Sequence, residues 1–280
     1  MISAQTKNEN KNWHAEIEIG FAYQRDKTLM ATLKQFGPLR VQRPFYPEDD
    51  VCHVYLLHPP GGIVGGDTLH TNISVEENSH ALMTTPGATK YYRSANDFAL
   101  VKNKLRLSNN SILEWFPQEN ILFPGAKVNI HTEIHLQGNA NIIAWDISCL
   151  GRPANNEIFS SGALNSTLSI YRDQMPIFIE HQRIFDKKHL SATAGLRNFP
   201  MSGLFICSGC NESHLLTARE VVSEVHSRLP LGITLLDDLL VLRILGQQTS
   251  LIQKTMIDIW QTLRPMIVNK IAMPPRIWST

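Results

Sequence analysis

Apolar and polar residues alternate along most of this chain, which is the period-2 pattern of β-strands that bury one face. The alternation is clearest over residues 13–23 and 126–136. In the second segment one face carries Val128, Ile130, Thr132, Ile134 and Leu136, and the other carries Lys127, Asn129, His131, Glu133 and His135. Shorter segments of strand-like composition predict further strands at residues 28–36, 52–58, 70–76, 81–85, 99–107, 112–116, 141–150, 168–172 and 176–185. Turn residues recur between them, which favours a sandwich, barrel or solenoid, although no sequence repeat of fixed period is visible.

The pattern changes after residue 212. Ser213 is placed to cap a helix that runs to residue 229, with apolar residues at mixed three- and four-residue spacing. A nearly continuous apolar run at residues 239–245 predicts a buried strand. Helical spacing returns over residues 249–264, and Pro265 is expected to end that helix because proline lacks the backbone N–H.

These elements predict a mainly β fold, an extended multi-stranded β body, sandwich- or β-helix-like, with two C-terminal α-helices. We expect a single domain over residues 1–280, in which residues 1–11 form a polar tail that can be disordered.

Composition narrows the class of protein further. The net charge is +1 and charged residues make up 18% of the chain, so charge gives no argument for binding nucleic acid or an anionic membrane. No apolar run approaches the roughly 18 residues of a membrane-spanning helix, and the polar N-terminus lacks the apolar core of a secretory signal. Four cysteines do not suggest a disulfide scaffold. We therefore expect a soluble cytoplasmic protein.

One loop is unusually rich in glycine. The sequence HPPGGIVGGDTL at residues 58–69 places four glycines among six residues and ends on one carboxylate, Asp67. It matches neither a P-loop, which needs Gly-Lys-Ser/Thr before a helix, nor a Rossmann fingerprint, since a strand-like segment follows it. We interpret it as a shaped turn between two strands, whose glycines let another surface approach the backbone closely.

Other candidate sites are weaker. His131 and His135 would lie about 13 Å apart on one strand, too far to share a metal ion, so a solvated face is the simpler interpretation. Cys207 and Cys210 have metal-ligand spacing but no second cysteine pair; structural or surface thiols are favoured over a soft-metal site. Asp146 lies inside an apolar strand, where a carboxylate must be neutral, paired or metal-linked, and a hydrogen-bonded structural role fits equally well.

Five blocks of sequence together resemble one known family. They are HPPGGIVGGD at residues 58–67, TTPGATKYYRS at 84–94, LEWFPQE at 113–119, WD at 145–146 with GRP at 151–153, and PRIW at 275–278. In this order they are similar to the signature blocks of the urease accessory protein UreD (also called UreH) family, and they span most of the chain.

The resemblance implies a non-enzymatic role in urease maturation. Members of the family bind UreF, which recruits the GTPase UreG, and the assembly docks on apo-urease so that nickel reaches the active site. The implied fold is an extended β body with C-terminal helices. The implied cargo is transient Ni²⁺ that moves through a passage lined by polar and acidic residues, with no tightly bound cofactor.

Scattered carboxylates suit such a passage, because carboxylate, imidazole and water ligands hold Ni²⁺ loosely enough to release it. The candidates for the nickel route are Asp67, Asp146, Glu157 and Glu180, of which Asp67 ranks first because it closes the glycine loop. Two positions depart from the family pattern: Asn156 replaces a glycine before Glu157, and the sequence after Glu180 is less arginine-rich than expected. The candidates for partner binding are Trp260, Arg276 and Trp278.

Two alternatives stay open. The chain could be a small-molecule hydrolase or lyase that uses the glycine loop, Asp67 and a nearby histidine. It could also be a plain β-rich interaction module without a metal function.

Overall fold

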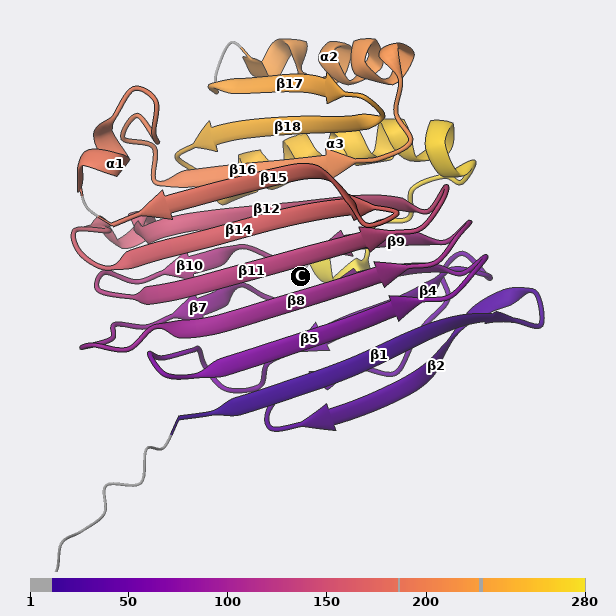
Figure 1. The fold of residues 1–280 in the computed structure, drawn as a ribbon. Helices are drawn as coiled ribbons and strands as arrows, with labels where there is room; N and C mark the ends of the chain where they lie inside the picture. The colour runs from indigo at the N-terminus through magenta and orange to yellow at the C-terminus, as the bar shows by residue number, and fades with distance from the viewer. Residues whose placement is uncertain (1–11, 186, 227–228, 280) are drawn as a thin grey trace, which may run out of the picture.

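The computed structural model describes residues 12–185, 187–226 and 229–279, and it shows two stacked β-sheets with helices on the far side of the second sheet (Figure 1). The polar tail predicted at residues 1–11 lies outside the described residues. The first sheet has seven strands in the order β15-β14-β11-β8-β5-β1-β2. In chain order they are β1 (His14–Gln24), β2 (Lys27–Phe36), β5 (Thr68–Val75), β8 (Ala99–Leu107), β11 (Lys127–Leu136), β14 (Ala163–Arg172) and β15 (Met175–Ile184).

The second sheet has eleven strands, eight of them along the path β17-β18-β16-β12-β9-β6-β4-β3. Their bounds are β3 (Arg40–Val41), β4 (Cys52–Leu57), β6 (His80–Thr84), β9 (Ile112–Phe116), β12 (Asn141–Arg152), β16 (Met201–Cys207), β17 (Leu231–Leu236) and β18 (Leu239–Gly246). Three short strands join it at the side: β7 (Thr89–Tyr91), β10 (Asn120–Leu122) and β13 (Glu157–Ile158).

The chain passes back and forth between the two sheets. Strands β1, β5, β8, β11 and β14 pair in parallel in the first sheet, and β4, β6, β9 and β12 do so in the second. Successive coils therefore stack as in a β-solenoid, closed by antiparallel strands such as β2 and β15 at the ends of the first sheet. The mainly β fold with C-terminal helices is confirmed, and the β-helix-like form of the prediction is the closer one.

Side-chain alternation builds two cores. Along β12, Ile142 and Ala144 face the first sheet, whereas Ile143 and Ile147 face the helices. Asp146 shares the parity of Ala144 and so faces the space between the sheets. The predicted alternation of β11 is confirmed as well, with Val128, Ile130, Ile134 and Leu136 buried.

Helices α2 (Glu212–His226) and α3 (Thr249–Val268) pack against each other, and α3 also contacts β12, β16 and β18. The shorter helices are α1 (Lys187–Ser191), η1 (Pro153–Asn155) and η2 (Arg276–Ser279). The predicted cap of α2 was wrong by two residues. The side chain of Asn211 accepts hydrogen bonds from the backbone N–H groups of Ser213 and His214, at 3.0 and 3.3 Å, so Asn211 caps the helix. Residues 227–228, at the predicted end of this helix, lie outside the described residues.

The predicted end of α3 was also wrong, because the helix continues through Pro265 to Val268 and ends at Asn269 in the left-handed conformation. A proline inside a helix costs about 3 kcal/mol through the lost hydrogen bond and the ring clash. The fully buried residues Leu263 and Arg264 immediately precede it, and their tertiary contacts hold this turn in place. Among the described residues, none of the helices has the length and apolar character needed to cross a membrane.

Candidate functional site

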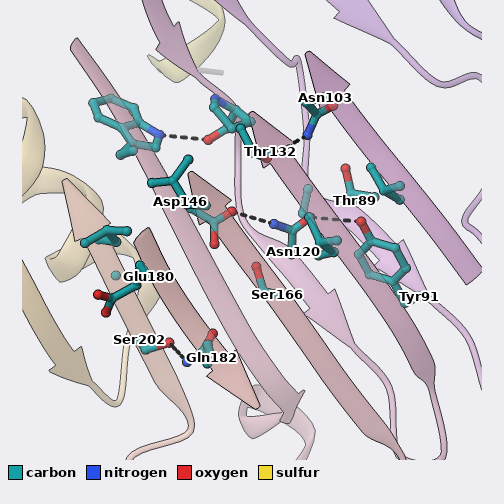
Figure 2. A pocket seen from close by; sticks show the side chains of 18 of the residues that line it. Thr89, Tyr91, Asn103, Asn120, Thr132, Asp146, Ser166, Glu180, Gln182 and Ser202 are labelled. Atoms are coloured by element: carbon teal, nitrogen blue, oxygen red, sulfur yellow. Dashed lines mark hydrogen bonds between the residues drawn. The ribbon is translucent and has the colours of Figure 1, made fainter. Parts of the chain in front are cut away.

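A cavity of about 980 Å³ lies between the two sheets. Its wall on the first sheet includes a row of register neighbours that runs across five strands: Thr71, Asn103, Thr132, Leu168 and Glu180. The Asn103 side chain donates a hydrogen bond to Thr132 Oγ1 at 3.1 Å. The wall on the second sheet includes Asp146, Ser202 and Leu204. Two carboxylates thus enter the cavity, one from each sheet (Figure 2), and its wall also carries basic side chains such as Lys90 and Arg183.

Asp146 is bonded to a neutral partner. The Asn120 side-chain N–H group donates to Asp146 Oδ1 at 2.9 Å, and Tyr91 Oη donates to Asn120 Oδ1 at 3.2 Å (Figure 2). Burial raises the pKa of Asp146 from 3.8 to about 6, against the opposing effect of the Asn120 hydrogen bond. The carboxyl group therefore changes charge in the range of weakly acidic pH.

Glu180 is paired with a cation. Arg243 on β18 donates to both carboxylate oxygens, with Nε–Oε1 at 3.0 Å and Nη2–Oε2 at 2.7 Å. Because Glu180 is on β15, this bidentate pair links the two sheets at one side of the cavity. The hydrogen bonds that Arg243 donates to Glu180 raise the pKa of Arg243. Glu180 therefore presents a neutralised carboxylate, unlike Asp146.

Asp67 and Glu157 do not line the cavity. Asp67 is buried, and its two oxygens accept the backbone N–H groups of Trp13 and Val64, at 2.8 and 2.9 Å. Glu157 forms an ion pair with Arg152, in which the Nε–Oε2 distance is 2.8 Å. Of the four carboxylates predicted from the sequence, the structure brings only Asp146 and Glu180 together in one cavity.

The departure at Asn156 leaves the turn before Glu157 intact. Asn156 has a φ of 57°, in the left-handed region that glycine would otherwise occupy. Asparagine tolerates this region better than most residues with a side chain.

The glycine loop forms part of the cavity wall. Ile63 pairs with the 89–94 segment, donating its backbone N–H to the carbonyl of Lys90 at 2.8 Å and accepting the N–H of Tyr92 at 2.8 Å. A Cβ atom at Gly62 would lie 2.8 Å from that carbonyl and 2.4 Å from the Tyr92 ring. The prediction that these glycines allow a close approach of another backbone segment is confirmed.

The remaining polar candidates lie elsewhere. Glu133, between His131 and His135 on the outer face of the first sheet, approaches Lys104 at 3.8 Å, and the His135 ring stacks on Tyr171. Cys207 and Cys210 are free and buried, which excludes the surface-thiol alternative, and burial raises the pKa of Cys207. Within the described ranges, no group of three or more His, Cys, Asp or Glu side chains is arranged to hold a metal ion.

Comparison with known proteins places the chain in a family. The family described as UreD urease accessory protein matches residues 14–279. The chain belongs to the UreD family. It is 48% identical to the urease accessory protein UreD of Alcanivorax borkumensis, with 99% of this chain and 96% of the relative covered. It is 41% identical to that of Enterobacter sp. (strain 638), where both chains are covered completely, and 43% identical to that of Escherichia coli, with 96% and 97% covered. The family name implies a role in urease maturation.

The C-terminal segment of this UreD family member folds back onto the second sheet. The Trp278 indole N–H donates to Thr84 Oγ1 at 3.0 Å, and its ring lies 5.2 Å from that of Trp145 and 5.7 Å from that of Trp260. Trp260 is fully buried, so it has no surface for a partner and can act only by positioning α3. Arg276 is the exposed member of the three predicted partner-binding residues.

A buried ion network fastens α3 to this UreD scaffold. Arg264 is 0% exposed and contacts two carboxylates, with Nη2–Oε1 of Glu114 at 2.8 Å and Nη1–Oε2 of Glu48 at 2.7 Å. His80 lies 2.7 Å from Glu114, and His53 lies 2.8 Å from Glu48. Burial by itself raises the pKa of Glu114, but His80 and Arg264 outweigh it and lower that pKa to about 2.

Sequence reasoning missed this network and the Asn120–Tyr91 contact. A signal existed for Arg264, because it lies four residues after Trp260 and therefore on the apolar face of α3. No comparable signal marked Asn120, since its contact with Asp146 follows from the parallel pairing of β10 with β12.

Proposed function

We propose that this chain is a non-catalytic scaffold and metallochaperone. Together with UreF and the GTPase UreG it docks on apo-urease, and its inter-sheet cavity forms part of the path by which Ni²⁺ reaches the urease active site. The ion is cargo that passes through the chain rather than a resident cofactor.

The observation that carries this proposal is the pairing of family membership with a cavity that two carboxylates enter from opposite sheets. Imidazole suits Ni²⁺ best, while carboxylate and water oxygens bind it less strongly, so a few oxygen ligands release it readily. Asp146 offers an ionised oxygen at neutral pH, since its pKa is about 6. Glu180 is already balanced by Arg243, so it adds polarity without trapping the ion.

The C-terminal segment is the surface that we assign to UreF. Arg276 is exposed there, and three large apolar side chains near the end of α3 are exposed as well, namely Met266, Ile271 and Met273. Exposed apolar residues beside a basic one are typical of a protein–protein interface. Trp260 and Trp278 support this surface from beneath, through their ring contact.

The rival enzymatic function would need a free base at the glycine loop. Both oxygens of Asp67 already accept backbone hydrogen bonds, so no observation at this loop favours hydrolase or lyase chemistry. The third alternative, an interaction module without a metal function, differs from the proposal in its response to nickel.

The test is an Asp146→Asn variant expressed with urease and the other accessory proteins. We expect unchanged co-purification with UreF, but a nickel content in urease several-fold below wild type at limiting nickel. The control is Glu133→Gln, which removes a carboxylate from the outer face of the same β body and should leave nickel loading unchanged. Full nickel loading by Asp146→Asn would overturn the assignment of the cavity, and equilibrium dialysis that detects no Ni²⁺ binding by the complex would favour the interaction module.

A further inference from the structure

Three side chains from three strands form a hydrogen-bonded series at the cavity wall. Tyr91 on β7 donates to Asn120 on β10, and Asn120 donates to Asp146 on β12, at 3.2 and 2.9 Å (Figure 2). The three strands are neighbours in the second sheet, because β10 pairs in parallel with both β7 and β12. The series is therefore held by main-chain pairing rather than by loops.

The direction of the series is determined by its first member. Tyr91 is 2% exposed. Its burial is the main cause that raises its pKa, and the nearby charge of Asp146 adds to this, so the hydroxyl stays protonated and can donate. Its hydrogen bond orients the Asn120 carbonyl oxygen toward the tyrosine. The amide N–H group must then face Asp146, where it satisfies Oδ1. Among the described residues, no protein donor is bonded to Asp146 Oδ2.

We propose that Asn120, oriented by Tyr91, is the positioning residue that binds one oxygen of Asp146 and leaves the other directed to the cavity as a single-oxygen ligand for a passing divalent cation. This inference rests on the proposed function and deepens it. A single-oxygen contact binds a divalent cation less tightly than a two-oxygen contact, and weak binding is what transfer along a path requires.

The surroundings of Asp146 leave Asn120 as its dominant polar partner. The facing strands of the first sheet contribute the neutral side chains Thr71, Asn103, Thr132 and Ser166, and β16 contributes Ser202. Glu180 on β15 is paired with Arg243 on β18. The other charged or titratable side chains that line the cavity are Lys90, Arg183, Arg197, His58, His181 and His189. Glu114 on β9 and Arg264 on α3 are paired with each other within the helix-side network, and Glu157 on β13 is paired with Arg152.

This arrangement predicts how loss of Asn120 changes protonation. The hydrogen bond that Asn120 donates favours the ionised carboxylate against burial, so Asn120→Leu should raise the pKa of Asp146 above its wild-type value. Tyr91→Phe removes only the hydroxyl that orients the amide and should give a smaller rise. Since a proton and Ni²⁺ compete for the same carboxylate, the pH midpoint of nickel binding should move upward in the same order.

The experiment uses the full chain in its complex with UreF. The pKa of Asp146 is measured without metal by infrared or ¹³C NMR titration, with the carboxyl signal assigned by its absence in Asp146→Asn. Nickel binding is then measured from pH 5 to 8. The matched control is Asn165→Leu, which removes an asparagine that donates to Asn129 at 3.3 Å on the outer face of the first sheet, outside the cavity. Its titration should coincide with wild type.

An upward shift for Asn120→Leu and a smaller one for Tyr91→Phe, each with a matching shift in nickel binding, would support the inference. An unchanged pKa of Asp146 in these variants would overturn it. If Asn120→Leu fails to fold, Tyr91→Phe decides alone, because it preserves the ring. If the pKa shifts but nickel binding is the same in wild type and Asp146→Asn, the cation role inherited from the proposed function is overturned, while the positioning of Asp146 stands.

Discussion

Replacing Arg264 by methionine would leave two carboxylates buried without their common cation. Arg264 donates to both oxygens of Glu114 and of Glu48, and to the carbonyl of Ile271. It therefore joins β9, the segment before β4 and the C-terminal segment at one point. Methionine keeps most of the side-chain volume, so the change removes the charge and the hydrogen bonds rather than the packing.

The magnitude follows from the cost of an uncompensated buried charge. Removing one partner of a buried ion pair typically costs about 3–5 kcal/mol. For a chain of 280 residues, 1 kcal/mol corresponds to a shift in Tm of about 2 °C, so Arg264→Met should lower Tm by about 6–10 °C. Urea unfolding followed by tryptophan fluorescence is a suitable assay, because Trp260 lies within the network and donates to Glu114 at 2.5 Å.

The same helix offers a control. Lys254 pairs with Asp258 one turn away at 2.7 Å, but its side chain is 68% exposed. Lys254→Met should therefore change stability by no more than about 0.5 kcal/mol. The double variant Arg264→Met/Glu114→Gln should lose less than the sum of the single changes, since Gln removes one of the two carboxylates that Arg264→Met leaves without a cation. A loss below about 1 kcal/mol for Arg264→Met, or strict additivity in the double variant, would refute the reasoning.

Acid should reduce the stability that the buried Glu114 carboxylate contributes. The pKa of Glu114 is about 2 in the fold and 4.5 ordinarily, so its contribution to stability is complete above about pH 4.5 and is lost as the pH falls toward 2. Without Arg264 the folded-state pKa rises toward the ordinary value or above it. The acid unfolding midpoint of Arg264→Met should therefore lie at higher pH than that of wild type.

Two further predictions concern the cavity and the tail. For Asp146 the pH dependence of stability has the opposite sign to that of Glu114. Its folded-state pKa is raised from 3.8 to about 6, so wild type loses stability as the pH rises through that range. In urea unfolding, Asp146→Asn should therefore be more stable than wild type by about 1–3 kcal/mol at pH 7.5 but not at pH 3.5. Arg276→Glu, at an exposed position, should lower co-purification with UreF at least several-fold while it shifts Tm by less than about 1 °C; unchanged co-purification would remove Arg276 from the proposed interface.

Local periodicity predicted the strands well where one face of the strand is buried. Strand β11 alternates because one face of it packs in the core and the other meets solvent, so its sequence carries the pattern. Strand β16 was missed because Pro200 and Gly203 suggest a loop. In the structure Gly203 serves packing, since a Cβ atom there would lie 2.5 Å from Met256 and 2.7 Å from Ile252 of α3. A requirement imposed by a distant helix cannot be read from neighbouring residues.

The candidate nickel-route carboxylates were predicted only in part. A carboxylate inside an apolar strand marked Asp146, and the structure places it in the cavity. Asp67 ranked first because its loop suggested ligand approach, yet one of its oxygens accepts the N–H of Val64 in that loop and the other accepts the N–H of Trp13 just before β1. Backbone partners of this kind are invisible in a sequence, since their geometry forms only when the loop closes.

Two carboxylates on neighbouring strands have contrasting electrostatic surroundings. Ile143 on β12 pairs with Glu114 on β9, and Asp146 lies three residues further along β12, facing the opposite side of the sheet. Burial raises the pKa of both groups, but Glu114 receives an arginine and a histidine, whereas Asp146 receives one neutral amide. Their pKa values consequently move in opposite directions, to about 2 and about 6. A carboxylate that only held the sheet together would be more stable with a cation beside it, as Glu114 is. Among the described residues no such cation is paired with Asp146, so its charge stays available to a mobile one. This is the physical reason for the proposed transport role of the cavity, whereas Glu114 and Arg264 anchor α3 to the sheet.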